Sequence, residues 1–185
     1  HVDSFASFIV GPPIVHPGKF FGRTQEIKRI FDAWRRYPLQ NVAVVGAKRS
    51  GKSSLLHYVK NILEVDADQL RPTQVKPATD GHLNSAKPYS WVYVDFQDVR
   101  MWHQERLVRY ILESLGFPIP QPCDLGGFMD IMIDHVHSPT LILMDEIGAA
   151  LSAPELDMPF WWSLRSLGTN QTDGNLSLIH ISEPT

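Results

Sequence analysis

Residues 46–53 read Gly-Ala-Lys-Arg-Ser-Gly-Lys-Ser and match the pattern G-x-x-x-x-G-K-[ST], which constrains the fold more than any other segment of the chain. The two glycines permit backbone angles and close approaches that a Cβ atom would block, so successive N–H groups can turn inward around a phosphate. The pattern needs a strand before the loop and a helix after it. Both are predicted, because an apolar, β-branched run over 41–45 has the composition of a buried strand and helical spacing resumes from Leu55. The segment therefore predicts a phosphate-binding loop in an α/β fold.

The loop residues have distinct expected roles. Lys52 would lie along the β- and γ-phosphates of a nucleotide, and the Ser53 hydroxyl would ligate Mg²⁺. The positive N-terminal end of the following helix would add attraction for the phosphates. Lys48 and Arg49 have a second interpretation as solvated loop charges. The predicted nucleotide-binding residues of this segment are Gly46, Ala47, Lys48, Arg49, Ser50, Gly51, Lys52, Ser53 and Ser54.

Two acidic residues, Asp145 and Glu146, follow a continuous apolar run over Thr140–Met144. Ligands of open α/β sheets bind at the carboxyl ends of the strands, so both carboxylates are expected beside the loop. Asp145 would hold Mg²⁺, directly or through water, together with Ser53. Glu146 would polarise the attacking water. The predicted catalytic residues are Glu146 and Lys52.

Apolar periodicity predicts strands that alternate with helices, which indicates a parallel sheet covered by helices. The expected elements are a helix from Thr24 that ends before Pro38, a strand over Asn41–Val45, a helix containing Leu55–Ile62, a surface excursion over Asp66–Ser90, a strand over Trp91–Phe96, a helix over His103–Leu115 capped by Gly116, a helix over Leu125–Val136, a strand over Thr140–Met144 and a helix over Met158–Leu167.

Charge and composition exclude several classes of protein. The net charge is −3, so no global electrostatic attraction to nucleic acid or to anionic membranes is expected. The single cysteine, Cys123, can form neither an internal disulfide nor a Cys-rich zinc site. No apolar run approaches the roughly 20 residues that span a bilayer. We therefore expect a cytoplasmic protein with no membrane partner.

The loop and the Asp145-Glu146 pair resemble those of P-loop ATPases with an added catalytic glutamate, the class that includes AAA+ and STAND proteins. Phe20-Phe21-Gly22-Arg23, followed by Glu26, is similar to the F-x-G-R-x-x-E segment that precedes the loop in such ATPases of bacteria and archaea. The resemblance covers about residues 8–170. It implies a P-loop NTPase three-layer sandwich with strand order 5-1-4-3-2, in which a strand after Asp145-Glu146 lies between the loop strand and the Thr140–Met144 strand.

The same resemblance implies a division of the chain. Residues 1–23 would form a linker that contributes to the adenine site, with Phe20 or Phe21 as the apolar contact; a pair of core-packing phenylalanines is the alternative. Residues 24–175 would form an incomplete P-loop ATPase domain. The resemblance implies ATP and Mg²⁺ as cofactors. It also implies that the protein can self-associate through the ATPase domain.

Function is predicted at two levels. The resemblance implies Mg²⁺-dependent ATP binding and hydrolysis by a regulatory ATPase that acts as a nucleotide-controlled switch. The alternatives are a nucleic-acid-linked ATPase of the replication-initiator or transposition-helper type, and a module that only binds nucleotide. A kinase is the competing enzyme class, and Glu146 directly after Asp145 disfavours it.

Residues 176–185, Leu-Ser-Leu-Ile-His-Ile-Ser-Glu-Pro-Thr, resemble a translated sequencing adapter, and we expect them to be an adapter-derived scar. Residues 176–182 are β-branched and apolar enough to fill the central slot of the sheet, because an empty slot would leave backbone groups of two buried strands unsatisfied. His180 and Ser182 are accordingly not expected to act as nucleotide sensors. We expect this chain to be poorly stable and catalytically inactive, and the gene with its native continuation to encode an active ATPase.

Overall fold

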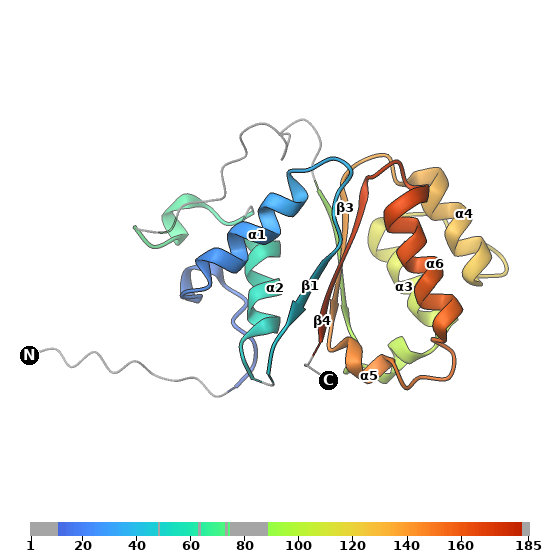
Figure 1. Cartoon of the computed structure of the whole chain (residues 1–185), viewed down its shortest axis with the longest axis horizontal. Helices are drawn as coiled ribbons and strands as arrows, with labels where there is room; N and C mark the ends of the chain where they lie inside the picture. Colours follow the sequence, from blue (N-terminus) through green and yellow to red (C-terminus); the bar gives the residue numbers. More distant parts are fainter. Residues whose placement is uncertain (1–10, 48, 63, 73, 75–88, 183–185) are drawn as a thin grey trace, which may run out of the picture.

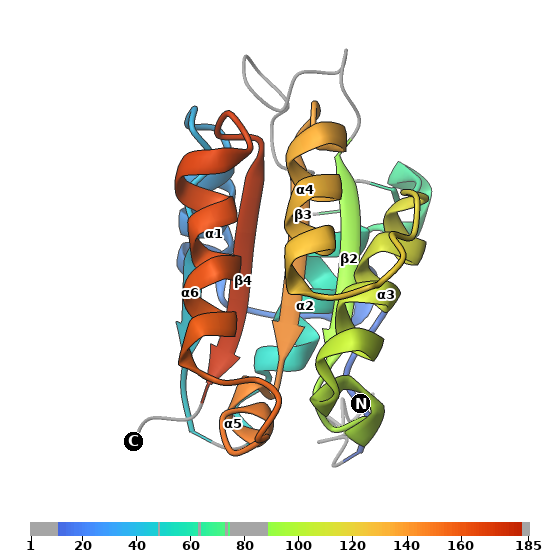
Figure 2. The ribbon, with the colours of Figure 1, turned by 90° about the vertical axis from the view of Figure 1, so that its right-hand side faces the viewer.

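The computed structural model of the chain describes residues 11–182 except 48, 63, 73 and 75–88. Its centre is a parallel four-stranded sheet in the order β1-β4-β3-β2. One face of the sheet carries α1 and α2, and the other carries α3, α4 and α6 (Figures 1 and 2). The strands are β1 (Val42–Val45), β2 (Ser90–Asp95), β3 (Thr140–Asp145) and β4 (Leu176–Ser182), and the helices are α1 (Thr24–Trp34), α2 (Lys52–Asn61), α3 (Gln104–Leu115), α4 (Leu125–His135), α5 (Ile147–Ala150) and α6 (Met158–Ser166). This three-layer α/β arrangement is the predicted fold class.

Local sequence signals explain where the helices lie and how they begin and end. α1 buries Ile30, Phe31 and Trp34 along one stripe, as their spacing predicts. The side chains of Asp124 and Asp157 cap the N-termini of α4 and α6 by accepting hydrogen bonds from backbone N–H groups. α3 ends at a left-handed Gly116, the predicted cap. Each predicted helix is present within a few residues of its expected bounds; the short α5 is an addition.

β4 lies in the central slot that the strand-order prediction assigned to residues 176–182. It pairs with β1 from Val42↔Ile179 to Val45↔Ser182, and with β3 from Thr140↔Leu176 to Met144↔His180. The observed order follows the 1-4-3-2 part of the predicted 5-1-4-3-2 arrangement. Leu176, Leu178, Ile179 and Ile181 are buried, so β4 contributes to the cores on both faces of the sheet.

Residues 42–45 form the predicted strand, β1, but the prediction that this strand is buried is wrong. In β1, half-buried and exposed residues alternate, and the side chain of Val45 is 59% exposed. Val42 and Val44 pack into the core beneath α1 and α2. Ala43 faces the other side, where it lines an open groove beside α6. β1 is an edge strand that pairs with β4 alone among the described strands, and on the side of Ala43 it borders the groove instead of a packed core.

The predicted surface excursion over Asp66–Ser90 falls largely outside the described residues. Its described part contains a short 3₁₀ helix at Ala67–Gln69 and the first residue of β2, Ser90. Among the described residues, no helix is both long and apolar enough to cross a membrane.

Candidate nucleotide-binding site

Residues 46–51 connect β1 to α2, as the pattern predicts, and Lys52 and Ser53 are the first residues of α2; glycine is needed at both ends of this connection. A Cβ atom on Gly46 would lie 3.0 Å from Ser50 Oγ and 3.6 Å from Lys52 Cδ, so a side chain there would enter the space inside the loop. Gly51 has a φ of 80° and precedes the first residue of α2. Arg49 also adopts a left-handed conformation, with φ 59°. Lys48, predicted to contact phosphate, lies outside the described residues.

Lys52 reaches back over the loop. Its side chain is buried, and Nζ donates hydrogen bonds to the carbonyls of Gly46 (2.8 Å) and Ala47 (2.9 Å). An ammonium group has three donors, so one N–H remains for a phosphate oxygen. Ser50 Oγ is buried beside it and has no partner among the described residues. The loop thus surrounds a positive charge and an unused hydroxyl.

The segment before α1 lies along α2, close to the loop. Ile14 N donates a hydrogen bond to Ser54 Oγ (2.9 Å), and Asn61 Nδ2 donates one to the carbonyl of Val15 (2.9 Å). Ser54 therefore joins the N-terminal segment to the first turn of α2. Ser53, the predicted Mg²⁺ ligand beside it, is half-buried.

Arg23 connects the segment resembling F-x-G-R to the phosphate loop. Its guanidinium Nη2 donates a hydrogen bond to the carbonyl of Ser50 and lies 3.6 Å (Nη1) from Glu26 Oε1. Arg23 itself is left-handed, with φ 54°, at the start of α1. The resemblance identified this segment, but the contact with the loop is visible only in the tertiary structure.

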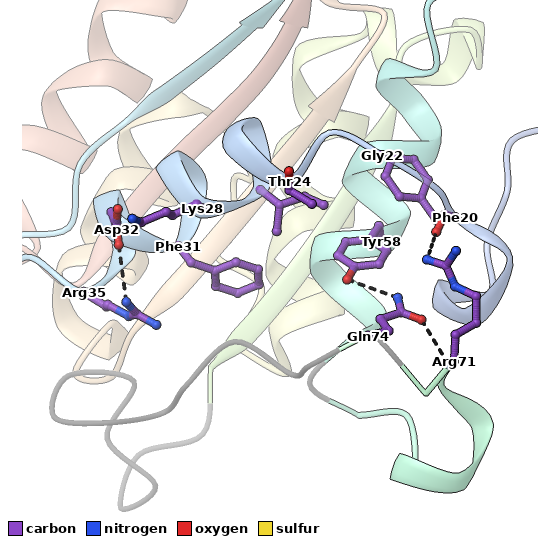
Figure 3. A pocket seen from close by; sticks show the side chains of 11 residues that line it. Phe20, Gly22, Thr24, Lys28, Phe31, Asp32, Arg35, Tyr58, Arg71 and Gln74 are labelled. Carbon is purple, nitrogen blue, oxygen red and sulfur yellow. Dashed lines mark hydrogen bonds and ion pairs between the residues drawn. The ribbon is translucent and has the colours of Figure 1, made fainter.

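The two phenylalanines of that segment have different environments. Phe20 is buried and packs against Tyr58 with ring centroids 4.9 Å apart. Both rings line a pocket of about 360 Å³ between α1, α2 and the segment around Arg71 (Figure 3). Phe21 is 69% exposed, and the guanidinium carbon of Arg71 lies 3.7 Å from its ring centroid. Phe20 is thus both a core residue and a pocket residue, whereas Phe21 is neither.

Asp145 ends β3 in a position shielded from solvent. Its side chain is 4% exposed, and its Oδ2 accepts a hydrogen bond of 2.6 Å from the Tyr93 hydroxyl. Its Oδ1 is also buried and has no partner among the described residues. Glu146 follows in a left-handed conformation, φ 54°, and is half-buried at the start of α5. A non-glycine residue in this region is strained, and such strain is concentrated at functional sites.

His57 and Tyr93, to which the sequence patterns assigned no role, link α2 to Asp145. Their rings stack with centroids 4.7 Å apart and an interplanar angle of 22°. Burial lowers the pKa of His57, although the nearby Asp145 carboxylate opposes that shift. Burial and the hydrogen bond to Asp145 raise the pKa of Tyr93, so the phenol stays protonated and donates. Only the strand register, which pairs Tyr93 with Leu143, could have indicated this neighbour of Asp145.

The phosphate loop and the Asp145-Glu146 pair lie at the same end of the sheet, whereas the pocket that Phe20 lines contains no residue of the loop. β1, β4 and β3 are parallel, so the loop after Val45 and the carboxylate of Asp145 both lie at their carboxyl ends. One strand separates β1 from β3, which puts these ends about 10 Å apart. Serine hydroxyl and carboxylate oxygens suit Mg²⁺, and the unpartnered, buried Oδ1 of Asp145 is an oxygen that a cation would satisfy. The residues present therefore fit a Mg²⁺–nucleotide complex.

Other groupings of potential ligands do not compete with this site. No group of three or more His, Cys, Asp or Glu side chains within the described part of the chain could hold a metal ion by itself. His180, on β4, has its pKa lowered by burial, and its backbone lies between Ala43 and Met144.

No protein-family profile and no curated protein sequence matches the chain. Solved structures do resemble it. The ORC2 protein of Aeropyrum pernix in ADPNP–ADP complexes has a TM-score of 0.63 at 13% identity, over 96% of this chain and 43% of that one. Its ADP form gives 0.57 at 13% identity, over 87% and 40%. A Walker-type ATPase of Pyrococcus abyssi gives 0.53 at 15% identity, over 92% and 47%.

These similarities and the observed strand order show that the chain has the predicted three-layer α/β fold with the strand order of P-loop NTPases. This chain spans less than half the length of the proteins it resembles.

Proposed function

We propose that the chain is the ATP-binding part of a Mg²⁺-dependent ATPase. The observation that carries the proposal is that Lys52, at the start of α2, and Asp145, at the end of β3, both follow the carboxyl ends of parallel strands of one sheet. Lys52 supplies a buried cation with a spare N–H, and Asp145 supplies a buried carboxylate with an unpartnered oxygen. In a bound nucleoside triphosphate with its Mg²⁺ ion, a phosphate oxygen would accept the spare N–H of Lys52 and the cation would be a partner for the Asp145 oxygen.

The roles of the remaining residues follow from their positions. The N–H groups of residues 46–53 and the N-terminus of α2 would bind the β-phosphate, and Ser53 with Asp145 would hold Mg²⁺. Bound Mg²⁺ would neutralise the charge that develops on the phosphates during hydrolysis. Glu146 directly follows Asp145 and would accept a proton from the attacking water.

The adenine base is assigned to the segment that precedes α1. This segment runs along α2 through the Ile14–Ser54 and Val15–Asn61 hydrogen bonds, and Ser54 lies in the first turn of α2, directly after the phosphate loop. Phe20 lines the pocket between α1, α2 and the segment around Arg71, whereas Phe21 is exposed and lines no part of it, so we propose Phe20 as the apolar contact. Residues 1–23 then contribute to the base site and residues 24–175 form the ATPase domain.

Titration of the chain with a fluorescent ATP analogue tests this proposal. We expect saturable binding in the micromolar range that unlabelled ATP and ADP reverse and adenosine does not, because the loop recognises phosphate. No binding at millimolar nucleotide would refute the proposal. Equal competition by GTP would retain the phosphate site and remove the assignment of adenine specificity.

We further propose that the protein is a regulatory ATPase whose bound nucleotide controls a switch. The alternative is an ATPase that acts on nucleic acid. The net charge of −3 supports the switch, because binding to a phosphate backbone relies on clustered positive charge. The structural similarity to ORC2 is consistent with the replication-initiator alternative, so that alternative is tested as well. Fluorescence anisotropy with labelled duplex DNA in about 50 mM salt, with and without Mg-ATP, separates the two: nucleotide-dependent DNA binding would favour the alternative.

A further inference from the structure

We propose that Tyr93 is a positioning residue that orients the Asp145 carboxylate toward the divalent cation. The inference rests on the proposed function, because it concerns the cation that accompanies the nucleotide. It assigns a role to a residue outside the phosphate loop and outside the Asp145-Glu146 pair.

The parallel register of β2 and β3 brings the two side chains to one face of the sheet. Tyr93 pairs with Leu143, and Asp95 pairs with Asp145. Side chains two residues apart in a strand share a face, so Tyr93 and Asp145 are diagonal neighbours on the α2 side. Their hydrogen bond, 2.6 Å from the Tyr93 hydroxyl to Oδ2, is in the short range of charge-assisted O–H···O⁻ bonds.

This hydrogen bond makes the two carboxylate oxygens unequal. Oδ2 is occupied by the Tyr93 hydroxyl, whereas Oδ1 is buried and has no partner among the described residues. Fixing one oxygen removes the rotational freedom of the carboxylate, so the direction of Oδ1 is set before a cation arrives. Partners that orient ligating carboxylates commonly change metal affinity by about 10- to 100-fold.

Tyr93 is itself held in place by α2. Its ring stacks on His57, with centroids 4.7 Å apart, and α2 also carries Lys52 and Ser53 at its first turn. The helix that presents the predicted Ser53 ligand therefore also fixes the phenol that orients Asp145. The two cation ligands, from strands and helices distant in the sequence, are set relative to one another through the His57–Tyr93 stack.

The test compares Tyr93→Phe with a matched control, Tyr110→Phe. Phenylalanine at position 93 keeps the ring and removes only the hydroxyl. Tyr110 donates a hydrogen bond of 2.8 Å to the backbone carbonyl of Tyr93, so the control removes a neighbouring hydroxyl that does not touch Asp145. Fluorescent-ATP affinity is measured in EDTA and then across a Mg²⁺ titration, together with the melting temperature without nucleotide.

We expect Tyr93→Phe to bind ATP in EDTA within about twofold of the unmodified chain, and to need about tenfold more Mg²⁺ for half of the Mg²⁺-dependent effect. Tyr110→Phe should leave both values unchanged. In an Asp145→Asn background, Tyr93→Phe should have no additional effect, because it acts through that carboxylate.

An unchanged Mg²⁺ requirement in Tyr93→Phe, with ATP binding intact in the unmodified chain, would overturn the inference and leave the proposed function standing. Equal shifts in both tyrosine variants, or failure of Tyr93→Phe to fold, would also overturn it, since the hydroxyl would then be a general structural element. Absence of ATP binding by the unmodified chain would instead refute the proposed function.

Discussion

Replacement of Lys52 by alanine should weaken ATP binding by two to three orders of magnitude while changing the stability of the nucleotide-free chain only slightly. The two effects separate because the ammonium group has different partners in the two states. Without nucleotide, Nζ is bonded to the carbonyls of Gly46 and Ala47. With nucleotide, its remaining N–H would face the phosphates.

The nucleotide-free effect is a difference between opposing terms. Each hydrogen bond from a charged donor contributes roughly 1.5–3 kcal/mol. The Lys52 side chain is only 5% exposed, so removing it also removes the desolvation penalty of a buried cation, which is of similar size. Water can reach the carbonyl of the exposed Ala47 in the variant. We therefore expect a shift in melting temperature of no more than about 5 °C.

The effect on ATP binding has no such compensation. Two unit charges about 4 Å apart interact by about 4 kcal/mol at an effective dielectric constant of about 20. Loss of that energy corresponds to nearly a 1000-fold rise in Kd, which moves a micromolar affinity to the millimolar range.

Fluorescent-ATP titration and thermal unfolding of the same samples check both halves of this prediction. Lys60→Ala is the matched control, because Lys60 lies in the last turn of α2, on the same helix but away from the loop. The control should keep the ATP affinity of the unmodified chain. Unchanged affinity in Lys52→Ala would refute the assignment of residues 46–53 as a phosphate site, and a loss of affinity in both variants would indicate a nonspecific charge effect.

Three further predictions concern turnover, stability and the gene. In a form of the protein that hydrolyses ATP, Glu146→Gln should keep ATP affinity and lose about 10²–10⁴-fold in the rate of phosphate release, because an amide cannot accept the proton of water. Glu64→Gln is the exposed control, and unchanged turnover in Glu146→Gln would make Glu146 structural. Mg-ATP at about 100 times its Kd should stabilise the chain by about 2.7 kcal/mol, or roughly 5–10 °C, and no shift with millimolar ATP would contradict binding. If residues 176–185 derive from an adapter, resequencing of the gene should not recover their codons, and recovering them would refute the adapter interpretation.

Much of the fold could be predicted from the sequence because its signals are local. Residues close together in the sequence predicted three of its features: the apolar stripe of α1, the Gly116 cap and the apolar run that becomes β3. Their spacing matches the period of a helix or a strand. The position of β4 between β1 and β3 came from the family resemblance and is confirmed. Burial of β1 was predicted wrongly, because an apolar composition does not show whether a strand lies at the edge of a sheet or whether both of its faces are packed.

The candidate site divides along the same line. The phosphate loop and the Asp145-Glu146 pair were predicted because each is a contiguous pattern whose chemistry depends on residue type and spacing. The resemblance treated Phe20 and Phe21 as interchangeable, whereas packing buries the first against Tyr58 and exposes the second beneath Arg71.

By itself, the sequence determined a P-loop α/β domain and the residue types that would meet a phosphate and a cation. Only the tertiary structure decided how they are held: Arg23 on the Ser50 carbonyl, and the Tyr93 hydroxyl on Asp145. Those contacts join residues far apart in the chain, and they depend on the register of β2 against β3 and on how α1 and α2 pack on the sheet. Periodicity and motif spacing depend on residues close together in the sequence, so they cannot predict contacts such as Arg23–Ser50 and Tyr93–Asp145.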